Sequence, residues 1–217
     1  MPTYFQTFVE AASVWMMFLT AYGALVFDAQ VKAGDFVIIS AASSSVGLAA
    51  IQIANYAGAA PIALTRTSEK KRRLHEAGAP HVIATQEQDM VAEVMRITNG
   101  NGARVAFDPV GGPDFPKLIA ALTFQGIAYI YGALSEGDTP IPVLEMIPKM
   151  PAVKGYSLRL VMGEEARRKA AIEYVTRGLA SGALKPVIDR TFKFDEMVEV
   201  HRYLENSGQF GKIVVTL

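Results

Sequence analysis

A strand-to-helix turn built from small residues is the part of this sequence with the clearest chemical meaning. The turn spans residues 41–47 and follows the apolar run 36–39. In it, Ala42, Ser44 and Gly47 have the spacing of the pattern G-x-G-x-x-G, of which only the last glycine is kept. Phosphate binds to the free N–H groups at a helix N-terminus, and small residues let it come close. From the turn alone, a pyrophosphate site and a serine-rich helix cap are equally good interpretations.

The end of the next predicted strand distinguishes between two dinucleotides. In an NAD site, an acidic residue about 20 residues beyond the glycines accepts hydrogen bonds from the ribose 2′-OH. Residues 63–68 contain no acid; Arg66 stands there instead, and Lys70 follows one helical turn later. A guanidinium binds a 2′-phosphate that a carboxylate would repel. The sequence therefore favours NADP(H) over NAD(H), and the alternative is an ordinary basic helix start at residues 70–73.

Alternating strands and helices are expected to position both features. We expect strands at 36–39, 61–65, 81–83, 103–107 and 126–131, and helices at 46–54, 69–76, 88–98 and 115–122. Four prolines between residues 140 and 151 predict a loop or a broken helix, followed by helices at 164–181 and 194–206 and a strand at 211–217. This order is typical of an α/β fold with a doubly wound parallel sheet, the Rossmann type.

Composition excludes several functional classes. The 217 residues carry 21 Lys+Arg, 21 Asp+Glu and no cysteine. Balanced charge argues against a nucleic-acid binder, and the lack of cysteine excludes disulfides, a cysteine nucleophile and cysteine-ligated zinc. His75, His81 and His201 are scattered, so we expect no metal site. A cysteine-free chain fits a reducing compartment, and we expect a cytoplasmic protein.

Two uncharged stretches have the composition of membrane segments. The first, at residues 11–27, has no Lys or Arg before it and so lacks the positive region of a signal peptide. The second, at residues 36–65, is interrupted by the serines at 43–45 and by Gly47, Asn55, Gly58 and Pro61. A buried strand, turn and helix explain it better than a membrane helix. We interpret both stretches as core and expect no contact with a membrane.

Five segments together resemble the medium-chain dehydrogenase/reductase superfamily, and most closely its zinc-independent quinone oxidoreductase-like branch. They are TAYGAL (20–25), GDFVIISAASSSVG (34–47), VAFDPVGG (105–112), YGALS (131–135) and GKIVV (211–215). The resemblance covers nearly the whole chain. It implies a helical segment at 1–30, an NADP-binding Rossmann domain at 31–155, and a C-terminal segment at 156–217 that resembles the returning part of a catalytic domain.

The resemblance also implies where NADP(H) would lie on this chain. The implied contacts are Ser43, Ser44, Ser45 and Val46 for the pyrophosphate; Arg66 and Lys70, with Thr65 beside them, for the 2′-phosphate; Asp108, Pro109 and Val110 for the adenosine ribose; and Gly132, Ala133, Leu134, Thr20, Phe210 and Lys212 for the nicotinamide. Tyr22 and Tyr131 are further polar candidates near the nicotinamide. A tyrosine at such positions is more often packed with a satisfied hydroxyl.

The implied activity is hydride transfer from NADPH to a small electron-poor carbonyl, enone or quinone. In the family, the proton donor and most of the acceptor pocket come from a GroES-like domain whose larger part this chain lacks, so the catalytic residues stay unassigned. The alternative is a truncated or non-catalytic NADPH-binding module that acts through a partner subunit. A zinc-containing, NAD-linked alcohol dehydrogenase is disfavoured by Arg66. Edge-strand pairing in the family implies a homodimer, with residues 151–160 near the edge.

Overall fold

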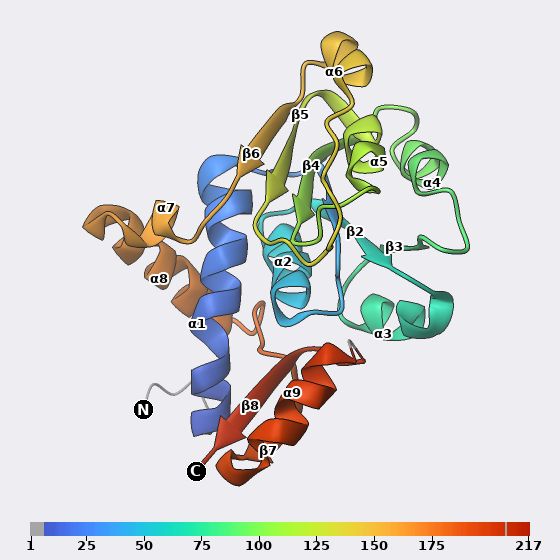
Figure 1. Cartoon of the computed structure of the whole chain (residues 1–217). Coiled ribbons are helices and arrows are strands. Elements are labelled where there is room, and N and C mark those ends of the chain that lie inside the picture. Colours follow the sequence, from blue (N-terminus) through green and yellow to red (C-terminus); the bar gives the residue numbers. More distant parts are fainter. Residues whose placement is uncertain (1–6, 207) are drawn as a thin grey trace.

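A six-stranded parallel sheet forms the centre of the computed structural model, which describes residues 7–206 and 208–217 (Figure 1). Its strands are β1 (Phe36–Ile39), β2 (Ala60–Thr65), β3 (His81–Ala84), β4 (Ala103–Asp108), β5 (Leu122–Ile130) and β6 (Ala152–Gly155). Their order is β3-β2-β1-β4-β5-β6, and each neighbouring pair is parallel. The order reverses between β1 and β4, which is where open α/β sheets bind ligands.

Helices cover both faces of this sheet. They are α1 (Phe8–Tyr22), α2 (Ser45–Tyr56), α3 (Lys71–Glu76), α4 (Met90–Ile97), α5 (Phe115–Ala120), α6 (Val143–Lys149), α7 (Arg159–Met162) and α8 (Glu165–Ala180). Val37 and Ile39 of β1 join the core on the α1, α2 and α3 side, and Ile38 joins the core on the α4 and α5 side. Because both faces are covered, β1 is apolar at every position. The fold class expected from the sequence is confirmed.

Helix α1 is long and is continued by a π-helical turn, Gly23–Asp28. Thr7 caps its start, because its hydroxyl accepts a hydrogen bond from the Glu10 N–H. The stretch Phe8–Asp28 is long and apolar enough to cross a membrane by length and composition, and 61% of its most apolar window is buried inside the structure. A helix in the core of a folded protein is buried in this way, which agrees with the interpretation of residues 11–27 as core.

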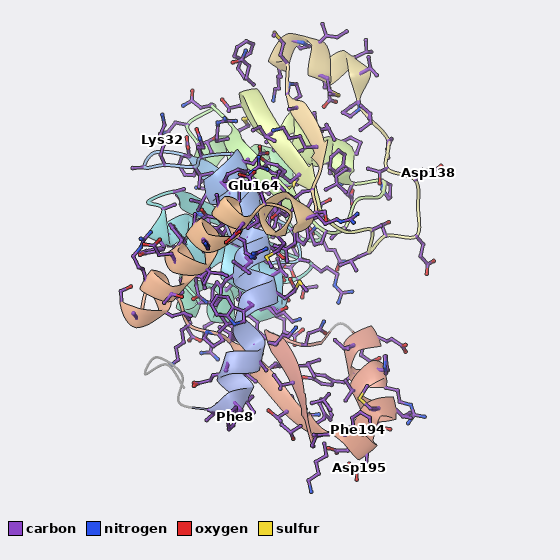
Figure 2. The ribbon with its side chains drawn as sticks, turned by 90° about the vertical axis from the view of Figure 1, so that its left-hand side faces the viewer. Phe8, Lys32, Asp138, Glu164, Phe194 and Asp195 are labelled. Carbon is purple, nitrogen blue, oxygen red and sulfur yellow. The ribbon has the colours of Figure 1, made fainter. Side chains whose placement is uncertain are left out.

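The C-terminal residues form a second, smaller layer at the lower end of Figure 1. Strands β7 (Ile188–Lys193) and β8 (Lys212–Thr216) pair in parallel, and a 3-10 turn (Phe194–Glu196) and α9 (Met197–Glu205) connect them. In Figure 2, Phe194 of this layer lies at the same end of the molecule as Phe8 of α1. Both side chains are exposed.

Most expected elements are confirmed, and the differences have a physical reason. The broken helix expected between residues 140 and 151 is α6, which contains Pro148. Strands β6 and β7 were not expected. Half of β6 is Lys154 and Gly155, and β7 carries Asp189 and Arg190, so neither has the apolar run of a buried strand. Both strands lie at sheet edges, where short strands with charged side chains are common.

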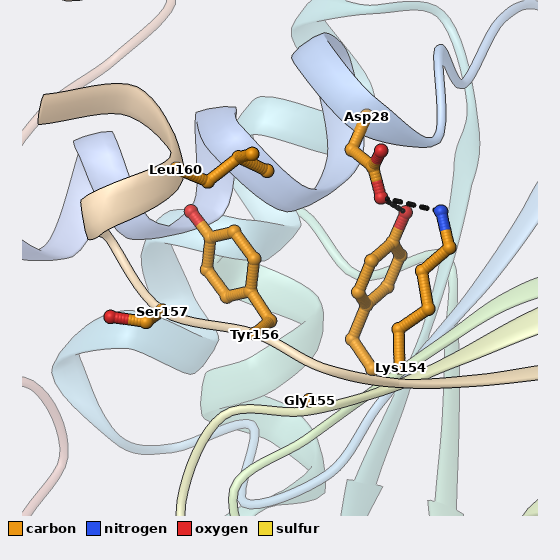
Figure 3. A pocket seen from close by; sticks show the side chains of 7 residues that line it. Asp28, Lys154, Gly155, Tyr156, Ser157 and Leu160 are labelled. Carbon is orange, nitrogen blue, oxygen red and sulfur yellow. Dashed lines mark hydrogen bonds and ion pairs between the residues drawn. The ribbon is translucent and has the colours of Figure 1, made fainter. Parts of the chain in front are cut away.

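One carboxylate fastens the end of the π-helical turn to the edge of the sheet. Asp28 Oδ2 accepts a hydrogen bond from the Tyr129 hydroxyl (2.6 Å) and one from Lys154 Nζ (2.9 Å), as Figure 3 shows. Burial alone would raise the pKa of Asp28, but these two hydrogen bonds outweigh burial and lower it. The same figure shows Tyr156 beside this group; its buried hydroxyl has no hydrogen-bond partner among the described residues.

We predict that Tyr129→Phe lowers the free energy of unfolding by about 1.5–3 kcal/mol, because it removes a hydrogen bond to a charged group. The matched control is Tyr156→Phe, which removes a hydroxyl without a partner and is expected to cost nothing or to stabilise the fold. Urea unfolding of both variants near neutral pH measures the difference. Equal losses in the two variants would contradict this account of Asp28.

The Asp28 contribution also has a predicted pH dependence. Because its pKa is lowered in the folded state, its stabilisation is present above the ordinary aspartate pKa of 3.8 and is lost as the pH falls through the lowered value. The difference in free energy of unfolding between the wild type and Asp28→Asn should therefore shrink on acidification. A difference that grows at acid pH would contradict it.

Candidate functional site

The turn between β1 and α2 has the geometry of an anion site. The Ser44 hydroxyl accepts a hydrogen bond from the Gly47 N–H (3.0 Å) and so caps the helix. The N–H groups of Ser45 and Val46 lie in the first turn of this twelve-residue helix, where the helix itself offers no acceptor. A side chain at Gly47 would lie 2.6 Å from the carbonyl oxygen of Ala41. The retained glycine therefore lets the helix approach the turn.

The C-terminal segment closes onto the same turn. The Gly211 N–H donates to the Ser43 carbonyl (2.9 Å), and Ser44 and Gly211 form a parallel bridge. Lys70 Nζ donates to the Ser43 hydroxyl (3.3 Å) and to the Gln209 carbonyl (3.1 Å). Residues almost 170 positions apart thus surround one helix N-terminus.

Positive charge gathers beside this turn. Arg66 is exposed at the end of β2, Lys70 is half-buried, and the Arg73 guanidinium lies 4.1 Å from the centre of the Phe210 ring. Burial lowers the pKa of Lys70, and the charges of Arg66 and Arg73 lower it further. Asp189 lies 3.8 Å from Arg73 and compensates part of this charge. A bound phosphate would relieve the repulsion among the three cations.

The next two expected contact segments lie side by side at the ends of β4 and β5. The Leu134 N–H donates to the Pro109 carbonyl (3.1 Å). Asp108 is buried, and its carboxylate accepts hydrogen bonds from the N–H groups of Val110 (3.2 Å) and Gly111 (2.7 Å). Burial raises the pKa of Asp108, and these bonds oppose the increase. Asp108 therefore shapes the loop that carries Pro109 and Val110.

Gly132 allows the segments 108–110 and 132–134 to touch, because a side chain at this position would lie 2.7 Å from the Pro109 carbonyl oxygen. Ala133 and Leu134, which follow, are exposed at the carboxyl edge of the sheet. The Thr65 carbonyl, at the end of β2, accepts a hydrogen bond from the Thr85 N–H (2.8 Å). Residues 108–110 and 132–134, expected to contact the ribose and the nicotinamide, therefore lie at the same edge of the sheet as the turn at residues 41–47.

A cavity of about 480 Å³ opens where α1, α2 and the ends of β5 and β6 meet. Its lining residues are Met16, Thr20, Val46, Tyr131, Tyr156, Ser157 and Leu158. The structure thus brings together Thr20, Val46 and Tyr131, which were expected from the sequence. The other four were missed, and the segment 156–158 carried no motif that could have indicated them. A second cavity of about 420 Å³ lies on the Asp28 side of Tyr156 (Figure 3).

Buried polar atoms without a partner are rare in folded proteins, and each needs an explanation. Among the described residues there are three such side-chain atoms: the hydroxyls of Tyr131 and Tyr156 and Oε1 of Gln209. Both tyrosines line the 480 Å³ cavity, and the backbone of Gln209 binds Lys70 beside the phosphate turn. The two tyrosines thus belong to the cavity, and Gln209 belongs to the segment beside the turn between β1 and α2.

Six residues expected near the nicotinamide do not line this cavity: Gly132, Ala133 and Leu134, described above, and Tyr22, Phe210 and Lys212. The Tyr22 ring packs against Tyr174, with 5.0 Å between ring centres, and does not line the cavity. Phe210 is buried under Arg73 on the phosphate side, and the Lys212 N–H donates to the Val187 carbonyl (2.8 Å) within the C-terminal layer. No group of three or more His, Asp or Glu side chains arranged to hold a metal occurs in residues 7–206 and 208–217.

The comparisons with known proteins agree with this geometry. A family model described as zinc-binding dehydrogenase matches residues 45–177. A quinone oxidoreductase of Homo sapiens is 28% identical over 211 residues, which are 97% of this chain and 63% of that protein. A 2-haloacrylate reductase of Burkholderia sp is 28% identical over 213 residues, or 95% of this chain and 63% of that protein. The chain thus spans less than two thirds of the length of these relatives.

Solved structures show the same fold. The Escherichia coli quinone oxidoreductase complexed with NADPH superposes with a TM-score of 0.88 at 25% identity, over 97% of this chain and 66% of that one. The family model covers more than half of the chain, and the doubly wound parallel sheet is the fold class expected from the sequence. The chain therefore belongs to the zinc-binding dehydrogenase family of the medium-chain dehydrogenase/reductase superfamily, in its quinone oxidoreductase-like branch.

Proposed function

We propose that this chain binds NADPH along the carboxyl edge of its sheet and serves hydride transfer to a small electron-poor carbonyl, enone or quinone. One observation carries the proposal: Arg66, Lys70 and Arg73 gather beside the Ser43 turn, and residues 63–68 at the end of β2 carry no carboxylate. A 2′-phosphate fits this charge, whereas the free 2′-OH of NADH would leave it uncompensated.

The residues present fit the rest of the dinucleotide. The N–H groups of Ser45 and Val46 suit a pyrophosphate, and the loop held by Asp108 suits the adenosine ribose. The 480 Å³ cavity beside Thr20 has the size and the apolar lining that a nicotinamide ring needs. When bound, NADPH supplies the hydride, and the chain supplies its placement and the exclusion of water. We assign residues 31–155 to this cofactor-binding unit.

We propose that these residues work without zinc. The sequence has no cysteine, and the described residues hold no suitable cluster of other ligands. The description zinc-binding dehydrogenase belongs to the family as a whole and is not evidence that this chain binds zinc.

A second candidate is an NADPH-binding module that acts through a partner. It is favoured by exposed apolar side chains on α1, because Phe8 is 84% and Met16 is 62% exposed, and Met16 also lines the cavity. Such a surface next to a ligand cavity suits a further protein layer. Turnover by the chain alone distinguishes the two candidates.

We further propose a cytoplasmic homodimer. Strand β6 has one free edge, and the adjoining segment 141–150 exposes Leu144, Ile147 and Met150. In Figure 1, α6 lies at the upper end of the sheet, beyond β5 and β6. An open strand edge next to exposed apolar side chains suits pairing with a second copy.

The cofactor preference has a direct test. We predict that Arg66→Ala weakens NADPH binding about tenfold, the loss expected for one charge-assisted hydrogen bond, and leaves NADH binding unchanged. The matched control is Arg72→Ala, because Arg72 is exposed and paired with Glu76. Calorimetric titration measures both affinities. If the wild type bound NADPH and NADH equally, the assignment of the 2′-phosphate site would be wrong.

The activity is tested by following the loss of NADPH absorbance with a panel of quinones, enones and aldehydes. We predict oxidation above the buffer rate with at least one acceptor. Tight NADPH binding without turnover for any acceptor would instead favour the non-catalytic module.

The oligomeric state is tested by sedimentation equilibrium. We predict a dimer that Leu144→Asp converts to a monomer, because a charge would be buried at the interface. Phe194→Asp places the same charge at the opposite end of the molecule and should leave the dimer intact. A wild-type monomer at the highest soluble concentration would contradict the proposal.

A further inference from the structure

Two residues that line the 480 Å³ cavity, Thr20 and Tyr131, carry hydroxyls that differ in their hydrogen bonds: one already donates its proton, and the other has no partner among the described residues. The Thr20 hydroxyl donates to the Met16 carbonyl at 2.6 Å. Since a hydroxyl has one proton, Thr20 Oγ1 can meet a ligand only as an acceptor. The Tyr131 hydroxyl is buried and makes no hydrogen bond to any described residue. Its proton therefore has no acceptor among the described residues, and Thr20 and Tyr131 give the lining of the cavity an acceptor and a donor.

Burial and the nearby charge of Asp108 raise the pKa of Tyr131. The phenol therefore stays protonated at any working pH and acts as a neutral donor. Its ring is held by stacking on Phe107, with 4.0 Å between ring centres and 19° between planes. A ring held in this way presents its hydroxyl with little loss of conformational entropy on binding.

The other unpartnered tyrosine in the cavity is placed differently. The Tyr156 hydroxyl lies against Gly23, where an added side chain would collide with it. It therefore faces the π-helical turn that continues α1, and Tyr156 also borders the Asp28 cavity. Tyr156 forms a wall of the cavity, and Tyr131 carries the other buried hydroxyl that can donate to a ligand. Ser157 also lines the cavity, but its side chain is exposed.

A primary carboxamide is the chemical group that matches this pair, because it has one carbonyl acceptor and an NH₂ donor. Resting on the NADPH site proposed above, we propose that the Tyr131 hydroxyl donates to the carboxamide oxygen of the nicotinamide and that Thr20 Oγ1 accepts from its nitrogen. Tyr131 is then a positioning residue. Its bond keeps the ring from turning over in the cavity and so fixes which face meets the acceptor.

The test compares NADPH with 2′-phospho-ADP-ribose, which lacks the nicotinamide, by calorimetric titration of the full chain. Tyr131→Phe keeps the ring stacking and removes only the hydroxyl. We expect its NADPH affinity to fall by about threefold to tenfold and its affinity for the fragment to stay unchanged. The melting temperature of the ligand-free variant should stay the same or rise, because an unpartnered buried hydroxyl is removed. Tyr22→Phe is the matched control and should change none of these values.

A second ligand separates the two hydrogen bonds. The 3-acetylpyridine analogue of NADP⁺ keeps the carbonyl oxygen and lacks the nitrogen. Thr20→Val should weaken binding of NADP⁺ but not of the analogue, whereas Tyr131→Phe should weaken both.

The failures of the two proposals can be told apart. Equal NADPH affinity for the wild type and Tyr131→Phe overturns the role of Tyr131, and so does an equal loss for NADPH and the fragment. If the wild type binds neither NADPH nor the fragment, the NADPH site itself is wrong, and the role of Tyr131 fails with it.

Discussion

The close approach of α2 to the end of β1 is the constraint on which the rest of the site depends. Gly47 has no side chain, so the helix comes within contact of the Ala41 carbonyl and of Ala42. Any larger residue would push the helix away from the turn. At this distance the helix N-terminus, with its unpaired N–H groups and positive dipole end, faces the carboxyl edge of the sheet. The cations Arg66, Lys70 and Arg73 and the cavity beside Thr20 are then arranged on either side of the N-terminus of α2.

The C-terminal segment completes this arrangement through backbone contacts. Gly211 has a φ of 120°, and a side chain there would lie 2.5 Å from the Val187 carbonyl oxygen. The chain can therefore pass between Val187 and the Ser43 turn. Lys70 is held between Ser43 and Gln209. The same lysine thus joins the proposed phosphate site to the last layer of the fold.

Local patterns predicted the sheet and much of the proposed site. The apolar run of β1, the small turn and the basic residue at position 66 each act over a few residues, because strand burial, turn sterics and charge are short-range properties. The polar edge strands β6 and β7 escaped prediction, since they are strands only by pairing with β5 and β8. Tyr156 escaped for a related reason, because its place depends on where β6 ends.

By itself, the sequence determined the fold class, the phosphate turn and the charge expected beside it. Only the tertiary structure decided which hydroxyls are satisfied: Tyr129 is bonded to Asp28, whereas Tyr131 and Tyr156 have no partner among the described residues. Only the tertiary structure, too, brought Lys70 to Gln209, 139 residues away. The reason is physical. Periodicity and turn chemistry are local, whereas the partner of a buried polar group depends on how distant segments pack.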